Sequence, residues 1–301
     1  MLGLVDWVFL AQFIVQFLLG LLVNGFIGLF NARGWIKSKR ISLYDSIVTT
    51  LALSRMVLLW ILLFDGVLML FSPIEHERGI VMKLIDFFWT LTNHLSIWLT
   101  TCLGVLYCLK IASFSHPTFL WLKWRVSRVV MWMLLGALLL SLGSTLSLIC
   151  EFKDQSGITE NVTDNIRMNI GEYSFKLIHV FGTFWYLPTL VVTLASYFLV
   201  ILSLGRHTRQ MQHSGAGSGD PSTEAHKRAI NVIFSFVLLF LLNFITLLIA
   251  WSSQFFPEPK IVAMTADAVT MLYSTGHSLI LVLGSPKLRQ AFVQLVPSGL
   301  M

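Results

Sequence analysis

The fold is decided by long apolar runs, and the second of them, residues 43–71, reads LYDSIVTTLALSRMVLLWILLFDGVLMLF. Seven such runs follow one another, each near the ~20 residues that a helix needs to cross a bilayer. A backbone inside lipid must satisfy its own hydrogen bonds, and a helix does so within one segment. The sequence therefore predicts an all-α fold, a seven-transmembrane helix bundle. We expect the spans at residues 5–31, 43–71, 82–110, 129–149, 177–204, 229–251 and 261–284.

Composition agrees with a protein that lives in a lipid bilayer. The 301 residues are 56% hydrophobic and only 12% charged, whereas soluble domains average ~25% charged residues. No linker is long enough to divide the chain, so residues 1–301 are expected to form a single domain. The one flexible low-complexity piece, residues 214–219, is SGAGSG, as in flexible linkers.

Local signals refine two of the helices. Asp220-Pro221 is typical of a helix cap and first turn, so the sixth helix is expected to begin near Ser222, ahead of its apolar run. Pro188 lies inside the fifth apolar run and is expected to kink it. Residues 287–296 alternate apolar and polar positions, which predicts a short amphipathic C-terminal helix on the inner leaflet.

Charge predicts the orientation in the membrane. Lys and Arg gather in alternate gaps between the spans, and 14 of the 21 fall on one side of the bundle, while most acidic residues of the gaps fall on the other. The positive-inside rule then places the amino terminus outside the cell and the carboxyl terminus in the cytosol, for a multi-pass protein of the plasma membrane. The sequon at Asn161, expected in an external loop, agrees with this topology. Charge spread along a membrane face does not suit a nucleic-acid partner.

Arg55 is the most costly residue in the predicted spans, because nothing near it in the sequence neutralises its charge within lipid. It is expected to face the bundle interior and to find partners on other helices, with Asn24 and Ser278 at suitable depth. Two interpretations stay open: a polar switch that links three helices, or a structural knot that fixes packing.

A second polar group lies in the outer half of the third span. Asp86, Trp89 and Asn93 follow at spacings of three and four, so they share one stripe of a helix, with His94 beside it. A charge, a flat apolar face and an amide suit a mostly apolar small molecule with a few polar groups. The alternative is hydrogen bonding between helices, with an aromatic residue at the membrane interface.

The seventh span has a matching stripe, on which Asp267 lies near the depth of Asp86. It could form the far wall of a pocket or pair with a ligand cation, or it could be a solvated carboxylate at the helix mouth. Aromatic residues at such spacings are more often core than pocket, and they become candidates because two polar stripes already point inward. The further candidates on the fifth, sixth and seventh spans are Phe181, Phe184, Trp185, Phe240, Asn243, Phe244, Thr270, Ser274 and His277.

Catalysis has little support in the sequence. It lacks a HExxH motif, a paired set of metal ligands, a Gly-x-Ser-x-Gly elbow and a phosphate loop. We therefore expect no enzyme activity, no metal and no cofactor. A transporter or channel would use the same polar stripes as a substrate path, but it predicts internal symmetry and broken helices, and an odd number of spans argues against equal inverted halves.

Several segments together resemble the type 2 (bitter) taste receptors, a family of G-protein-coupled receptors, over essentially the whole chain. They are NHLSIWL at 93–99, CLKIASFSHP at 108–117, FLWLKWR at 119–125, SLGRHT at 203–208, DPSTEAH at 220–226, HSLIL at 277–281 and KLRQ at 287–290. The resemblance implies a receptor that binds small bitter agonists and signals through a gustducin-type Gα. Sequence does not separate taste from an extra-oral chemosensory role.

The resemblance also implies roles for individual residues. Trp89 and Asn93 match the family's ligand contacts, and Phe181, Phe184, Phe240, Asn243 and Asp267 correspond to outer positions that contribute. Arg55 and Asn24 match its second-helix arginine and first-helix asparagine, and with His277 and Ser278 they would form the polar switch. The residues expected to face the G protein are Tyr107, Lys110, His207 and His226.

Two positions depart from the family pattern. Ser274 stands where a proline is common, three residues before His277-Ser278, and Ser285-Pro286 replaces a common asparagine before the last Lys-Leu. We expect these changes to affect the bend of the seventh helix and its junction with the terminal helix, rather than the fold.

Overall fold

The computed structural model describes residues 3–39, 42–72, 80–158, 186–213, 221–252 and 256–295. These ranges contain helices and no strands, so the predicted all-α class is confirmed. Seven of the helices are long and apolar enough to cross a membrane. The helices are α1 (Leu4–Ser38), α2 (Leu43–Phe71), α4 (Ile80–Ile111), α5 (Pro117–Trp124), α6 (Val126–Ile158), α8 (Leu187–His213), α9 (Pro221–Trp251), α10 (Pro259–Gly284) and α11 (Pro286–Leu295).

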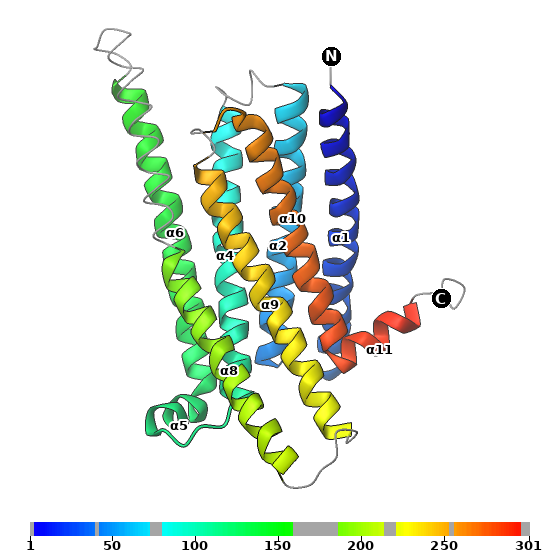
Figure 1. Cartoon of the computed structure of the whole chain (residues 1–301). Helices are drawn as coiled ribbons and strands as arrows, with labels where there is room; N and C mark the ends of the chain where they lie inside the picture. The colour runs from blue at the N-terminus through cyan, green and yellow to red at the C-terminus, as the bar shows by residue number, and fades with distance from the viewer. Residues whose placement is uncertain are drawn as a thin grey trace.

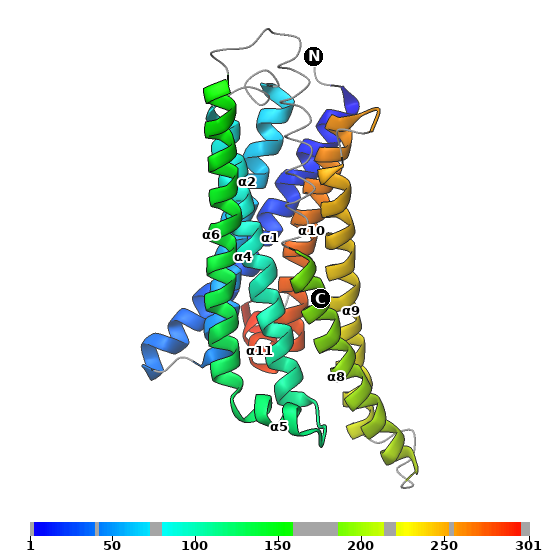
Figure 2. The same ribbon diagram turned by 90° about the vertical axis from the view of Figure 1, so that its left-hand side faces the viewer.

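The seven long helices run side by side as a bundle, and the two short helices lie at one end of it (Figure 1). The N-terminus lies at the opposite end. We call the end with the N-terminus the upper end and the end with α5 and α11 the lower end. Neighbours in the bundle are α1 with α2 and α10, α4 with α2, α6 and α8, and α9 with α8 and α10; Figure 2 shows the same order from the side.

Observed helix ends follow the local signals more closely than the apolar runs. The second helix has the predicted bounds, and α9 begins at Pro221, one residue before the predicted start. The sequence places a short helix at 287–296, and α11 occupies Pro286–Leu295. In the described residues, α8 begins at Leu187, so Pro188 lies in its first turn, where a missing N–H is tolerated, rather than at a kink within it.

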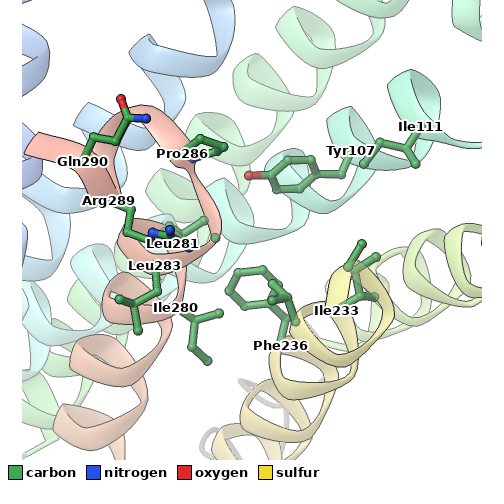
Figure 3. A pocket seen from close by; sticks show the side chains of 13 residues that line it. Tyr107, Ile111, Ile233, Phe236, Ile280, Leu281, Leu283, Pro286, Arg289 and Gln290 are labelled. Carbon is green, nitrogen blue, oxygen red and sulfur yellow. The ribbon is translucent and has the colours of Figure 1, made fainter. Parts of the chain in front are cut away.

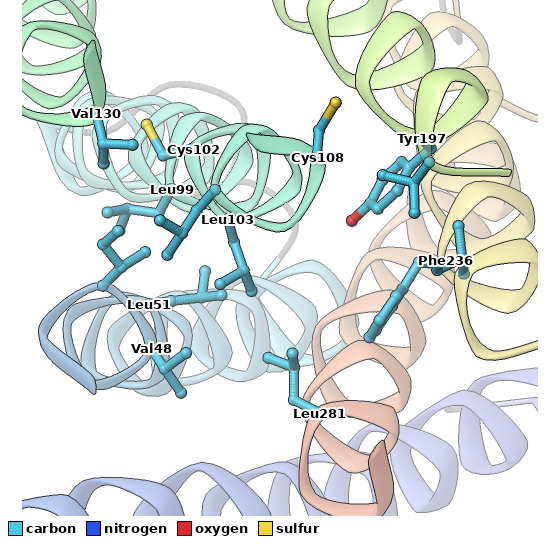
Figure 4. Close-up of a cluster of buried hydrophobic side chains, with 14 of the residues drawn as sticks. Val48, Leu51, Leu99, Cys102, Leu103, Cys108, Val130, Tyr197, Phe236 and Leu281 are labelled. Carbon is cyan, nitrogen blue, oxygen red and sulfur yellow. The ribbon is translucent and has the colours of Figure 1, made fainter. Parts of the chain in front are cut away.

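The largest buried cluster of the described residues draws side chains from most of the helices, and Figure 4 shows part of it around α4. Leu99, Leu103 and Leu106 of α4 are at most 2% exposed, and they pack with Val48 and Leu51 of α2. On the other side of α4, Tyr197 of α8 stacks on Phe236 of α9, with ring centroids 6.3 Å apart. The helix α4 is therefore the central element around which the others are arranged.

Exposed side chains on the outside of the bundle are apolar, as lipid contact requires. Trp132 and Leu139 of α6 are 70% and 62% exposed, and Phe234 of α9 is 61% exposed. In water such a surface would be an aggregation hazard, whereas acyl chains solvate it. Together with the seven apolar helices, this surface identifies a multi-pass membrane protein.

Small residues allow α1 and α2 to approach closely. A Cβ on Gly66 of α2 would meet the ring of Phe13 on α1, and a Cβ on Gly20 would meet a methyl carbon of Leu59 at 2.5 Å. Close backbone approach at small residues is the usual way in which membrane helices gain packing energy. These contacts hold α1 and α2 together beside the polar site described next.

Candidate functional site

Arg55 lies at the centre of a polar cluster that joins α2, α4 and α10. Its side chain is 0% exposed. Nη1 donates to Ser278 Oγ at 2.8 Å and lies 3.1 Å from His277 Nδ1, both on α10. Towards α4, Nη2 donates to Thr100 Oγ1 at 3.2 Å and Nε to Ser96 Oγ at 3.4 Å. One side chain thus binds two neighbouring helices at once.

The cluster continues to α1 through a short relay of hydrogen bonds. Ser278 Oγ donates to Asn24 Oδ1 at 2.7 Å, and Asn24 Nδ2 donates to the Gly20 carbonyl at 2.8 Å. Asn24 and Ser278 are therefore brought together with Arg55, as expected, although Asn24 is reached through Ser278. Four helices are joined in this way, rather than the three expected from the sequence.

The partners of Arg55 fix the form of His277. A guanidinium has only donors, so Nδ1 of His277 must accept and the imidazole must carry its proton on Nε2. That nitrogen is buried and has no partner among the described residues. Among the contacts described for Arg55 there is no carboxylate, and the guanidinium instead lies 5.5 Å from the centre of the Tyr273 ring. A buried cation held by neutral groups is costly.

Near the upper end, Trp89 of α4 lies between two apolar clusters. One includes Phe13 of α1 and Met264 of α10, and the other includes Phe240 of α9 and Tyr273 of α10. Trp89 is only partly buried and packs against both clusters. One turn below, Asn93 is 2% exposed and its Nδ2 donates at 3.5 Å to the Oη of Tyr186, the residue before α8.

Three acidic residues from three different helices lie in this region. The Asp267 side chain on α10 lies within interaction range of Asp65 on α2 and of Asp86 on α4. Carboxylates that face one region give it a negative potential. Asp65 was not among the residues expected from the sequence. Its sequence signal was that of a single carboxylate in the outer part of an apolar run, a residue type that lipid makes costly.

The α9 candidates face the same region. Phe240 is 2% exposed and packs with Ile97, Tyr186 and Tyr273. Asn243, one turn above, is 1% exposed, and its Oδ1 has no hydrogen-bond partner among the described residues. An unpaired buried amide in an apolar cluster is expensive, and it suits a ligand group that completes the pair. The candidates Phe181, Phe184, Trp185 and Asn161 lie outside the described residues.

At the lower end, a cavity of about 390 Å³ lies between α4, α9, α10 and α11 (Figure 3). Tyr107 points into this space from α4, and Ile233 and Phe236 line it from α9. The hydroxyl of Tyr107 donates to Tyr44 Oη of α2 at 3.1 Å. Lys110 is exposed on the same end of α4. His207 and His226 lie in α8 and α9, and their side chains are outside the described part.

Ring contacts connect the cavity to the Arg55 cluster and then to the region around Trp89 and Asn243, which we call the upper site. The ring centroids of Phe236 and His277 are 4.6 Å apart, and those of His277 and Tyr273 are 5.9 Å apart. Tyr273 in turn belongs to the cluster that contains Phe240 and packs against Trp89. A displacement at Trp89 can therefore reach the lower cavity through side chains in direct contact.

The helices α8 and α9 differ in how they are attached. Hydroxyl groups fasten α8 to its neighbours. Thr193 lies 2.8 Å from Thr101 of α4, and Ser203 Oγ accepts at 2.9 Å from the N–H of Ser113, which lies in the segment between α4 and α5. In contrast, the hydrogen bonds of the described α9 side chains, from Ser235 and Thr246, stay within that helix. Apolar contacts alone hold the described part of α9 against its neighbours.

This geometry can be compared with known proteins. Residues 1–298 match the family described as Taste receptor protein (TAS2R). The chain belongs to this taste receptor family. It is 63% identical to taste receptor type 2 member 3 of Papio hamadryas, over 98% of this chain and 94% of that protein. The human receptor of the same name is 61% identical over 97% of this chain and 94% of that protein. The Rattus norvegicus receptor is 53% identical over 99% of this chain and 95% of that protein.

Both departures from the family pattern have a clear place in this taste receptor. Ser274 is 0% exposed in an α10 that runs unbroken from Pro259 to Gly284, and its Oγ has no partner among the described residues. Ser285 ends α10 in an extended conformation and accepts the Leu288 N–H at 3.5 Å, while Pro286 occupies the first position of α11. These residues form a capped start for α11.

Within the described residues no group of three or more His, Cys, Asp or Glu could hold a metal ion. Ser96 and Thr100, which the sequence analysis missed, serve Arg55 by their spacing of four on one face of α4. The upper site combines an aromatic face, carboxyl groups and an unpaired amide, as small-molecule pockets do.

Proposed function

We propose that this receptor binds small bitter compounds in the upper part of the bundle and activates a gustducin-type heterotrimeric G protein at the lower end. Its family consists of taste receptors, a class of receptors and not of enzymes. The observation that carries the proposal is the continuous series of side-chain contacts from Trp89 through Tyr273, His277 and Phe236 to the lower cavity. It joins a site that can hold a ligand to one that can receive a transducer.

The ligand would lie against Trp89 and reach both carboxyl and amide groups. Its apolar body would pack on Trp89 and Phe240, and a hydrogen-bond donor would satisfy Asn243 Oδ1. A cationic group would be attracted by Asp65, Asp86 and Asp267, and cations also favour the face of a tryptophan. Asn93, already hydrogen-bonded to Tyr186, would fix the wall between them.

Activation follows if the agonist binds the active arrangement better than the resting one, because only this difference shifts the population. The element that is easiest to move is α9, since apolar contacts hold its described part and none of the described α9 side chains makes a hydrogen bond to another helix. A change in its contacts with Trp89 and Tyr273 would displace its lower end from α10. The Arg55 cluster would keep α1, α2, α4 and α10 together as a fixed frame.

The opened lower end would accept the C-terminal helix of the Gα subunit in a groove, with its apolar face on Phe236 and Ile233. Basic residues at this end, which carries Lys110, Lys287 and Arg289, support a cytosolic location. The N-terminus and the Asn161 sequon would then be extracellular in the plasma membrane. Loss of a glycosidase-sensitive mobility shift in Asn161→Gln would test this orientation, and an unshifted wild-type chain would contradict it.

The test of function is a ligand screen in cells that carry a chimeric Gα, with intracellular calcium as the signal and parent cells as control. For any agonist found, Trp89→Ala should raise the half-effective concentration about tenfold or more, as expected for a lost aromatic anchor. Surface expression should stay normal. Trp132→Ala, a lipid-facing tryptophan on α6, is the matched control. Equal potency for the two variants would remove Trp89 from the pocket.

A further inference from the structure

Helix α5 has two apolar faces, and the described part of the bundle covers one of them. Phe119 is buried and Leu122 is partly buried, and both belong to the large cluster around α4. On the outward face, Leu120 is 51% exposed, Trp121 55% and Trp124 96%. Large apolar side chains that are exposed together mark an interaction surface. Because tryptophan favours the boundary between lipid and water, this face suits the membrane surface at the lower end of the bundle.

Arg125, the residue between α5 and α6, is held in position on three sides. Its N–H donates to the Leu122 carbonyl at 3.1 Å, and its carbonyl accepts from the Val129 N–H at 3.0 Å. Its guanidinium lies over the Trp121 ring, 4.9 Å from the ring centre. A guanidinium that stacks by its face keeps the N–H groups of its edge available to an anion. The side chain is exposed and makes no hydrogen bond or ion pair to the other described residues.

A second exposed arginine, Arg128, lies in the first turn of α6. Residues three and four apart share one face of a helix, so Arg128 lies beside Met131 and Trp132, which are 57% and 70% exposed. The sequence has no acidic residue between Asp86 and Glu151, so α5 and the segments on either side of it supply no counter-charge. Two cations therefore lie at the end of an apolar, lipid-facing surface.

A phospholipid fits this surface better than a soluble partner does. Trp132 lies within the apolar stretch of α6, Val126–Gly143, that is suited to cross the membrane, where a soluble protein or anion does not reach. One turn further, a Cβ on Gly136 would have nothing within 4 Å, so the surface is open to an acyl chain. A phosphomonoester carries about −1.5 to −2 charges at neutral pH and pairs with guanidinium forks by parallel hydrogen bonds, so it matches two arginines.

We propose that Trp121, Arg125, Arg128 and Trp132, which we call the α5–α6 patch, bind a phospholipid whose headgroup carries a phosphomonoester. The phosphate lies between the two arginines, and the exposed tryptophans of α5 lie at the level of the headgroups. The acyl chain follows α6 past Trp132. The lipid thus gives one shared partner to two cations that otherwise repel each other, and it joins α5 to α6 from the outside. Binding needs neither an agonist nor a G protein, so it does not depend on the proposed function.

Native mass spectrometry of the purified receptor in detergent tests the binding. The probe is dioctanoyl phosphatidylinositol 4-phosphate, and its matched partner is dioctanoyl phosphatidylinositol, which has the same chains and ring but lacks the phosphomonoester. We expect saturable binding of the phosphorylated lipid with about tenfold higher affinity than its partner, as for an added charged hydrogen bond. Equal affinity of the two lipids for the wild-type receptor would overturn the proposal.

Variants locate the site. Arg125→Gln and Arg128→Gln should each weaken binding of the phosphorylated lipid about tenfold. Arg33→Gln is the matched control, because it removes an exposed arginine from α1, a helix on the other side of the bundle from α6 (Figure 1), and it should leave the affinity unchanged. Equal losses in all three variants would show diffuse attraction to a basic membrane face and would refute the patch, as would full affinity in Arg125→Gln and Arg128→Gln.

A fourth variant separates geometry from charge. Arg125→Lys keeps the positive charge but loses the planar fork, so its affinity should lie between those of the wild type and Arg125→Gln. Affinity equal to the wild type would show that charge alone acts, against a bound phosphate between two forks. Unchanged unfolding midpoints verify the fold of each variant. Should one fail to fold, the comparison of the two lipids on the wild-type receptor still decides.

Discussion

Neighbouring helices α8 and α9 both pack beside the centre of the bundle, but different forces hold them. Directional hydroxyl contacts fix α8 to α4 at Thr101–Thr193 and to the segment after α4 at Ser113–Ser203. Apolar clusters hold the described part of α9, which has no hydrogen bond to another helix within the described residues. Dispersion contacts can slide and repack, whereas a hydrogen bond in lipid must be replaced when it breaks. The difference assigns the moving part to α9 and the fixed part to α8.

The sharpest way to break this contrast is to fasten each helix covalently. Val232 Cγ1 lies 3.6 Å from the position of a Cβ on Gly284, so Val232→Cys with Gly284→Cys brings two thiols into disulfide range between α9 and α10. After oxidation in membranes, agonist-driven nucleotide exchange should fall to the level of receptor-free membranes. A reductant should restore it.

The control pair fastens the helix that is already fixed. Thr101→Cys with Thr193→Cys replaces hydroxyls 2.8 Å apart between α4 and α8, and oxidation should leave most of the exchange activity in place. Loss of activity in this pair, or full activity in the oxidised α9–α10 pair, would reverse the assignment of moving and fixed helices. Free thiol titration verifies that each bridge has formed.

The fixed frame depends on Arg55, and its removal should have the largest effect on stability. Arg55→Ala leaves Ser96, Thr100, His277 and Ser278 with unpaired polar atoms in a buried site. A buried polar group left unsatisfied costs about 1–3 kcal/mol, and several are left here while the costly cation is removed, so the free energy of unfolding in nanodiscs should fall by about 3 kcal/mol. Arg125→Ala, which removes an exposed arginine over Trp121, should change it little. Equal losses would mean that the Arg55 contacts do not support the frame.

Sequence reasoning reached Arg55 and its α10 partner because a lone cation in lipid must find polar groups at its own depth. It missed Ser96 and Thr100 because a hydroxyl in a membrane helix usually bonds its own backbone, as Thr100 Oγ1 does with the Ser96 carbonyl at 2.9 Å. Nothing in the sequence separates such a hydroxyl from one that also accepts from another helix.

The arrangement of the upper site could be predicted only within single helices. The stripe of Asp86, Trp89 and Asn93 was predictable because its members lie on one helix at spacings of three and four. Asp65 meets Asp267 across two helices, and the rotation of one helix against another is set by packing that no spacing within either helix reveals. The start of α9 at Pro221 was predictable because a cap and a first-turn proline are local signals.

A substitution of Asn243, on the mobile helix α9, is expected to raise the free energy of unfolding rather than lower it. Its Oδ1 is buried and has no hydrogen-bond partner among the residues that the structure describes, so Asn243→Leu, of similar volume, removes a polar atom that is unpaired there. The free energy of unfolding should rise by about 1 kcal/mol, while agonists that carry a hydrogen-bond donor lose potency. Thermal unfolding in nanodiscs and calcium responses measure the two effects. A stabilised variant with unchanged potency for every agonist would show that the amide does not meet the ligand. A destabilised one would show that it has a partner within the bundle.

The smallest effect is expected where one hydrogen bond between α8 and α4 is removed. Thr101→Val deletes one member of the hydroxyl pair with Thr193 but keeps the shape of the side chain. Hydrogen bonds between membrane helices average about 0.6 kcal/mol in double-mutant cycles, so the loss in unfolding free energy should be near that value, and Thr193→Val should add little to it in the double variant. Full additivity of the two losses would show that the hydroxyls do not act as a pair. Agonist potency should stay the same in all three proteins, because the second contact, at Ser113 and Ser203, continues to hold α8 to the segment that follows α4 while α9 moves.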